Sequence, residues 1–323
     1  MDPAQFFAAS RLVIVAGKGG VGKTTVSAAL ARAAARSGLS ALIVEVEGKS
    51  GLANLFGREP LTYDEVILSR GGGREGAADV RGRMLTPDDA LLEYLRDHGM
   101  SRISKRLVSS GALDVVATAA PGIKDILVLG KVKQLERAGK TDLLILDAPA
   151  AGHAITFLLS ARALLDAVRV GPINSQARDV LDMLTDHERC QVMLVTLPEE
   201  TPVNELVDTA YHLEDRVGVA LGPVVVNGLY PEIRGLDADP TDAAGRAGSG
   251  LRNGEAASLA AAADFRLHRM DLQRSQVERL AAQLPLPQLK LPYLFNADLG
   301  PADLEVLATE LLAGIGALQG TSS

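Results

Sequence analysis

The chain carries Gly17-Lys18-Gly19-Gly20-Val21-Gly22-Lys23-Thr24 just after the apolar run Leu12-Val13-Ile14-Val15. This stretch fits G-x-x-x-x-G-K-[ST], the phosphate-binding loop (P-loop) between a strand and a helix. Glycines let backbone N–H groups converge on phosphate oxygens, and the N-terminus of the helix adds positive potential. Lys23 would reach the β- and γ-phosphates, and the Thr24 hydroxyl would ligate Mg²⁺. Residues 17–24, together with Thr25, are therefore predicted to bind a nucleotide.

Composition places the chain among ordinary globular proteins. Its 323 residues, 47% hydrophobic and 23% charged, suffice for one large α/β domain. The net charge of −7 argues against a surface dedicated to nucleic acid or anionic lipid. The first ten residues do not read as a signal peptide, and no apolar run approaches eighteen residues, so we expect a cytoplasmic protein with no integral membrane segment.

Cys190 is the single cysteine of the chain. It excludes an internal disulfide and any C-x-x-C metal site, so neither zinc nor an iron–sulfur cluster is expected. Because the apolar run Val192–Val195 follows closely, we predict a buried structural thiol.

Short apolar runs alternate with longer helical patterns along the chain. This rhythm predicts one P-loop domain over residues 1–323, an α/β fold with a doubly wound, mostly parallel sheet. The predicted strands are Leu12–Val15, Ala41–Val46, Leu113–Ala117, Leu143–Leu146, Val192–Thr196 and Pro223–Val226. The predicted helices are Thr24–Ser37, Asp88–Asp97, Ile126–Ala138, Ile155–Ala167, Asn204–Leu213, Phe265–Gln283 and Pro301–Leu318. Segments 84–110 and 259–284 are candidates for a small helical cap, and residues 234–258 read as a flexible linker.

Asp147 is the candidate acidic residue of the Mg²⁺ site. It ends the apolar run Leu143–Leu146, which would deliver its carboxylate to the sheet edge that holds Lys23. The alternative role for Asp147 is as the N-cap of the following helix.

Lys18 narrows the class of P-loop. The pattern K-G-G-x-G-K-[ST] resembles the deviant Walker A loop of the ParA, MinD, nitrogenase iron-protein and ArsA group. There the early lysine crosses a dimer interface and touches the other subunit's phosphates, where a cation supplied in trans stabilises the charge that develops during phosphoryl transfer. A solvated loop lysine is the alternative. The resemblance also places Glu47 where the group carries the aspartate that handles the attacking water. An ion-paired loop acid is the alternative for Glu47, and Glu45 is placed on the opposite face of the strand.

Further segments resemble the ArsA/guided-entry (tail-anchored protein targeting) ATPase family over most of residues 11–315. Asp147–His153 is similar to its switch II, Ala120–Asp125 to its Pro-Gly segment, and Val195–Glu199 to its Pro-Glu turn. Val224–Asn227 resembles the strand whose terminal asparagine binds adenine, which implies that role for Asn227. Leu291-Pro292-Tyr293 resembles the segment that packs against the base, which implies that role for Pro292.

The resemblance implies ATP or ADP with Mg²⁺ as ligands, Lys18, Lys23 and Glu47 as catalytic residues, and Thr24 and Asp147 at the metal. It implies an ATPase that acts as a dimeric switch on an unidentified protein partner or client, as a homodimer or as a heterodimer with a paralogous ATPase. Six methionines and one cysteine do not suit tail-anchored clients or arsenite. The chain looks most like single-domain, zinc-free ArsA-like ATPases of actinobacteria.

Two other functions remain open. A ParA/MinD-like positioning ATPase is disfavoured because Leu304–Leu318 contains no Lys or Arg to attract anionic lipid. A low-activity pseudo-ATPase half of a heterodimer is motivated by the glutamate at position 47.

Overall fold

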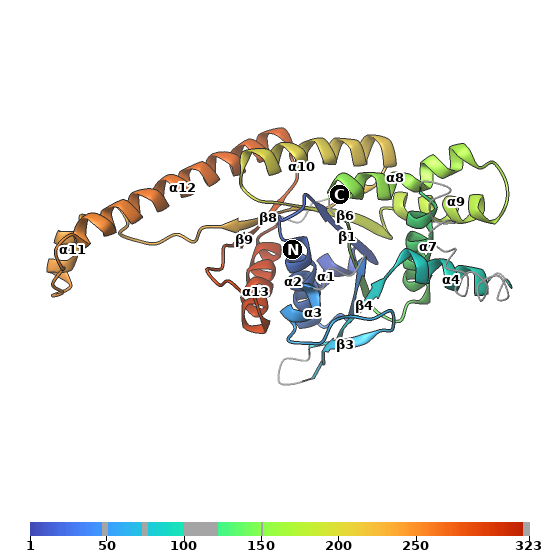
Figure 1. Ribbon diagram of the computed structural model, residues 1–323, viewed down its shortest axis with the longest axis horizontal. Coiled ribbons are helices and arrows are strands. Elements are labelled where there is room, and N and C mark those ends of the chain that lie inside the picture. Colours follow the sequence, from blue (N-terminus) through green and yellow to red (C-terminus); the bar gives the residue numbers. More distant parts are fainter. Residues whose placement is uncertain (47–50, 73–76, 98, 100–121, 150, 319–323) are drawn as a thin grey trace.

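The computed structural model of the chain describes residues 1–46, 51–72, 77–97, 99, 122–149 and 151–318. Its core is a nine-stranded sheet in the order β3-β4-β2-β5-β1-β6-β8-β9, with β7 paired to β6 (Figure 1). Every strand pair is parallel except β3–β4. The strands are β1 (Leu12–Gly17), β2 (Ala41–Val46), β3 (Val66–Ser69), β4 (Val80–Leu85), β5 (Leu143–Asp147), β6 (Cys190–Thr196), β7 (Ala220–Leu221), β8 (Val224–Leu229) and β9 (Gln288–Pro292).

The predicted α/β fold with a mostly parallel sheet is confirmed, and helices cover both faces of the sheet. One face packs against α1 (Pro3–Ala8), α2 (Lys23–Arg36), α3 (Gly51–Leu55) and α13 (Pro301–Ala317). The other packs against α4 (Pro87–Asp97), α7 (Ile123–Ala138), α8 (Ala151–Ala167), α9 (Pro172–Thr185), α10 (Glu200–His212) and the π-helical turn η1 (Leu213–Val217). Strands β1, β2 and β5 are buried on both faces, which is why their sequences are nearly continuous apolar runs.

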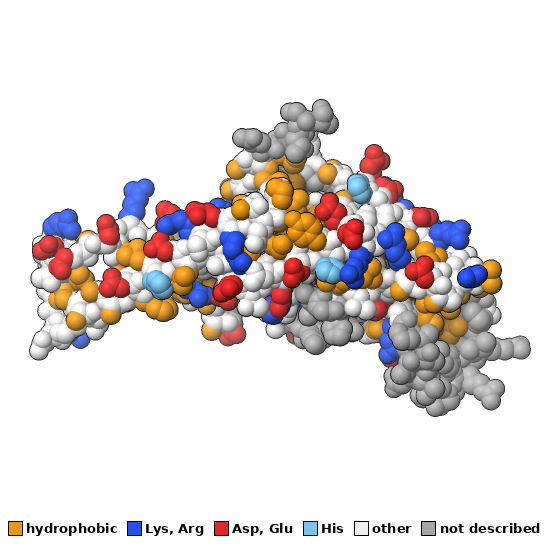
Figure 2. All heavy atoms as spheres, turned by 90° about the horizontal axis from the view of Figure 1, so that it is seen from above, with side chains coloured by type: hydrophobic (Ala, Val, Ile, Leu, Met, Phe, Trp, Pro, Cys, Tyr) orange, Lys and Arg blue, Asp and Glu red, His pale blue; other side chains and the backbone are white. Residues whose placement is uncertain are grey.

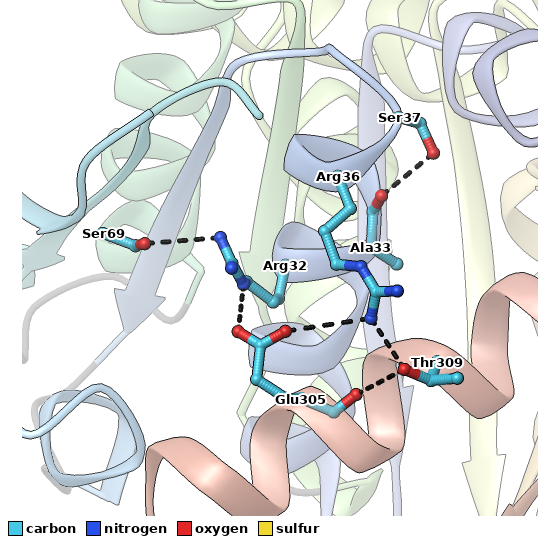
Figure 3. Close-up of polar contacts among 7 residues, drawn as sticks. All are labelled: Arg32, Ala33, Arg36, Ser37, Ser69, Glu305 and Thr309. Atoms are coloured by element: carbon cyan, nitrogen blue, oxygen red, sulfur yellow. Dashed lines mark hydrogen bonds and ion pairs between the residues drawn. The ribbon is translucent and has the colours of Figure 1, made fainter. Parts of the chain in front are cut away.

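A polar network fixes the P-loop helix α2 in place (Figure 3). The guanidinium of Arg32 on α2 binds the carboxylate of Glu305 on α13 and the hydroxyl of Ser69 at the end of β3. One turn later Arg36 donates to the Thr309 hydroxyl at 2.7 Å. Beneath these contacts the alanines of α2 are buried, so α13 packs closely on it. The phosphate-binding loop therefore leads into a helix that is fixed along its length.

Two helices form an arm that projects from the body. Figure 1 shows α12 (Glu255–Gln283) extending beyond the sheet, with α11 (Pro240–Arg246) at its far end, and we call α11 and α12 the arm. Only Gln273 and Leu280 of α12 are buried.

Three expectations differ from this structure. Residues 234–258, predicted as a linker, contain α11 and the first residues of α12. In the described part of the two candidate cap segments, α4 does not meet α12, because these helices lie toward opposite ends of the molecule (Figure 1). In the first of them, Met84 and Leu85 belong to β4. The predicted strand at 113–117 lies outside the described residues. None of the helices in the described part of the chain has the length and apolar character needed to span a membrane.

Candidate functional site

The phosphate-binding loop lies between β1 and α2. Gly22 ends it with φ +90°, and a Cβ there would lie 2.3 Å from Nδ2 of Asn227, so the position requires glycine on both counts. The Lys23 ammonium donates to the carbonyl of Lys18 at 3.1 Å, which holds it over its own loop. Burial lowers the pKa of Lys23, and the negative charge of Asp147 opposes that shift. This position suits a lysine that binds phosphate oxygens over the loop.

Asp147 is the last residue of β5, and two hydroxyls from α2 reach it. The Thr24 hydroxyl donates to Oδ2 at 2.6 Å, and the Ser27 hydroxyl donates to Oδ1 at 3.2 Å. Burial raises the pKa of Asp147, while the bond from Thr24, the charge of Lys23 and the bond from Ser27 oppose the shift. Because α8 begins at Ala151, Asp147 does not occupy the N-cap position of that helix.

A hydroxyl beside a carboxylate is a donor set of the hard oxygen type that Mg²⁺ prefers. Thr24 and Asp147 therefore fit the metal that the P-loop implies. No group of three or more His, Cys, Asp and Glu side chains that could hold a metal ion occurs among the described residues. A magnesium ion that completes its shell with phosphate oxygens and water needs no such group.

Glu47 lies outside the described residues, but Glu45 is described, and its predicted orientation was wrong. Glu45 pairs in register with Asp147, so both side chains lie on the α2 face of the sheet. The prediction overlooked that side chains two residues apart in a strand share a face. Glu45 is buried, and its pKa is raised to about 7, first by burial and second by the charge of Asp147.

Two adjoining clefts open at this edge of the sheet. The larger, about 780 Å³, runs from Thr24 and Thr25 past α3 to residues 297–300. The smaller, about 320 Å³, shares Thr25, Ala297 and Leu299 with the first. It continues to Gly20, Gly22, Asn227 and Pro292. The sequence-predicted residues Thr25, Asn227 and Pro292 thus line one continuous groove beside the loop.

Asn227 is also tied to the loop itself. Its Nδ2 donates to the carbonyl of Val21 at 2.9 Å, so its side chain braces the P-loop besides facing the groove. Beyond it lies an aromatic cluster that sequence reasoning missed: the rings of Tyr230, Tyr293 and Phe295 lie 4.7–5.4 Å apart, centre to centre. A signal was present, since Tyr293 and Phe295 stand close together in a chain that is only 3% aromatic.

Lys18 and Lys23 point to different partners. The Lys18 ammonium lies 2.5 Å from Oε1 of Glu205 on α10, and both side chains are about two-fifths exposed.

Cys190 is fully buried at the start of β6, as predicted, and burial raises the pKa of its thiol. The thiol therefore has no part in the site.

The sequence matches the anion-transporting ATPase (ArsA) family over residues 10–171, which include the P-loop, Glu45 of β2, Asp147 of β5 and the whole of α8. The chain belongs to this family. The family is described as one of anion-transporting ATPases.

Individual relatives agree with the family assignment. The ATPase BagA of Mycobacterium tuberculosis is 34% identical over 228 residues, which are 68% of this chain and 66% of BagA. The arsenical pump-driving ATPase of Escherichia coli is 26% identical over 68% of this chain and 35% of its own length. The ATPase get3 of Schizosaccharomyces japonicus is 26% identical over 54% of each chain. The match thus spans just under two thirds of BagA and smaller shares of the others.

Proposed function

We propose that the chain is a Mg²⁺-dependent ATP hydrolase that works as a nucleotide-driven dimeric switch on a protein partner. In this proposal the loop amides and Lys23 hold the phosphates, and Thr24 and Asp147 organise Mg²⁺. Glu47 handles the attacking water. Asn227 and Pro292 face the base in the smaller cleft. Bound Mg²⁺ would neutralise charge on the phosphates during transfer.

The observation that carries the dimer is the direction of Lys18. Its backbone carbonyl accepts from Lys23, whereas its ammonium points to Glu205, outside the groove of its own loop. In this orientation the Lys18 ammonium does not contact phosphates bound by its own loop, and it is accessible to phosphates bound by a second subunit. The partner subunit is a second copy of this chain or a paralogous ATPase.

The C-terminal helix favours this function over a membrane-positioning ATPase. Leu304, Leu307, Ala308, Leu311 and Ile315 of α13 are buried against the body. The apolar face that would enter a lipid surface is therefore already used, and the helix carries no Lys or Arg.

The test combines solution mass with two lysine variants. Light scattering without nucleotide, with Mg-ADP and with Mg and a non-hydrolysable ATP analogue should show a dimer that forms or compacts only with the analogue. Lys18→Ala should keep nucleotide affinity within about two-fold and lower turnover at least about a hundred-fold, by analogy with loss of a trans cation. Lys140→Ala, at an exposed lysine before β5, is the control.

Normal hydrolysis by Lys18→Ala would contradict the trans role. A mass and shape indifferent to nucleotide, in a chain that binds Mg-ATP, would instead point to a missing paralogue.

A further inference from the structure

A second carboxylate lies beside the predicted magnesium residues. Strands β2 and β5 are parallel neighbours, and their register pairs Ile43 with Ile145 and Glu45 with Asp147. The two isoleucines lie in the core on the α2 side of the sheet. The same alternation brings both carboxylates to that side at the carboxyl ends of the strands, where Thr24 already contacts Asp147.

The buried position of Glu45 is energetically unfavourable for an ionised carboxylate. Glu45 is 4% exposed and Asp147 is 6% exposed. Two buried carboxylates on adjacent strands repel one another when both are ionised. Within the described part of the chain, no Lys or Arg forms an ion pair with Glu45. A pair of buried carboxylates of this kind is stabilised by a bound cation. Lys23 acts on Asp147 and is already held by its own loop.

We propose that Glu45 is a second carboxylate of the magnesium site, which holds water of the metal shell beside Asp147 and strengthens Mg²⁺ binding in the nucleotide complex. Mg²⁺ dehydrates reluctantly and keeps several waters, so a carboxylate one strand away from the ligand can act through water. The inference rests on the proposed function, because the metal enters with the nucleotide.

The experiment compares Glu45→Gln with Glu214→Gln. Glu214 is an exposed carboxylate in η1 that lines neither cleft, so it controls for the loss of one negative charge. A fluorescent ADP is titrated at fixed protein over a range of Mg²⁺ concentrations. We expect the Mg²⁺ midpoint to rise about ten-fold in Glu45→Gln and to stay within about two-fold in Glu214→Gln. Without Mg²⁺, Glu45→Gln should bind the nucleotide at least as tightly as the parent chain.

Thermal unfolding separates this role from a merely structural one. Without metal or nucleotide, Glu45→Gln should melt higher than the parent, because it removes the repulsion from Asp147. A structural acid would give the opposite sign. Glu45→Asp keeps the charge and should shift the Mg²⁺ midpoint less than Glu45→Gln.

An unchanged Mg²⁺ midpoint in Glu45→Gln, or a lower melting temperature without metal, would overturn the inference. Failure of the proposed function looks different, since the parent chain itself would then show no Mg²⁺-dependent nucleotide binding.

Discussion

Lys18 and Lys23 stand five residues apart in one loop, yet they meet different partners. Lys23 is held by a backbone carbonyl of the loop, and Lys18 is held by a carboxylate of α10. The Lys18–Glu205 pair is partly exposed, and pairs of this kind contribute about 0–1 kcal/mol. Lys18 can therefore leave Glu205 for a phosphate at small cost, which suits a lysine that changes partners when subunits meet.

Removing Glu205 should make Lys18 easier to capture. In Glu205→Gln we expect nucleotide-dependent dimerisation to strengthen by up to about five-fold at low salt, because the competing ion pair is lost. Titrating the dimer by light scattering with the ATP analogue measures the effect. It should shrink in about 0.5 M salt, where exposed pairs are screened. Glu214→Gln, an exposed carboxylate in η1, is the control. Weaker dimerisation in Glu205→Gln would mean that Glu205 itself contacts the partner.

The raised pKa of Glu45 predicts a pH dependence of stability. Its pKa rises from 4.5 to about 7 on folding, so between these values the folded state binds more protons than the unfolded state. In the parent chain, stability from this residue is therefore lost as pH rises from about 4.5 to about 7. Glu45→Gln should match the parent near pH 4.5 and become more stable above pH 7, by up to about 3 kcal/mol. Urea unfolding without Mg²⁺ at several pH values tests this, and a constant difference across the range would contradict it.

Sequence reasoning located the residues of the site that belong to contiguous motifs. The P-loop and Asp147 were predicted because each belongs to a motif whose residues are adjacent in the sequence. The Lys18–Glu205 pair and the Asn227–Val21 bond join positions far apart in the sequence, so they exist only through the fold. The face on which Glu45 lies could have been predicted from the sequence, because residues two apart in a strand, such as Glu45 and Glu47, are expected to share a face. The prediction placed these two residues on opposite faces.

At the scale of elements, buried strands were predicted best. β2 was predicted with its observed bounds, since Ala41–Val46 is apolar on both faces apart from Glu45. β4 was missed because Arg81, Gly82 and Arg83 interrupt its pattern, although Arg83 is buried beneath the ring of Tyr63. The start of α12 was missed because Glu255–Ala263 has the alanine content of a helix but no apolar periodicity.

The docking of α13 on α2 predicts which of its contacts matter. Leu311 is fully buried in the core on that face, whereas Glu305, which binds Arg32, is nearly half exposed. Leu311→Ala should therefore cost about 2–5 kcal/mol of unfolding free energy, and Glu305→Gln about 1 kcal/mol or less. Urea unfolding measures both. The reverse order would mean that the polar network of Figure 3, and not the apolar contact, holds α13 in place.

At the scale of the whole molecule, the arm contacts residues beside the groove that Thr25, Asn227 and Pro292 line. Arg266 of α12 lies over the rings of Tyr230 and Phe295 and donates to the carbonyl of Pro231 at 2.8 Å. Tyr293 of the same cluster lines the smaller cleft. Phe265, next to Arg266, is 68% exposed, and Leu259, which lies farther out, is 48% exposed. Figure 2 shows hydrophobic side chains among charged ones along this face. The base of the arm is thus part of the body of the protein, and its outer part is not.

This division predicts that the outer arm can be removed without loss of the fold. The Arg266–Pro231 bond brings the two ends of the outer arm close, so deletion of residues 235–262 with a Gly-Ser linker of about six residues should close without strain. Because this segment adds nothing to either core cluster, we expect a melting temperature within about 3 °C of the parent and nucleotide affinity within about two-fold. Circular dichroism melts and fluorescent ADP titration measure the two quantities. Loss of folding would mean that the outer arm stabilises the body, and weakened nucleotide binding alone would mean that it holds the aromatic cluster against the groove.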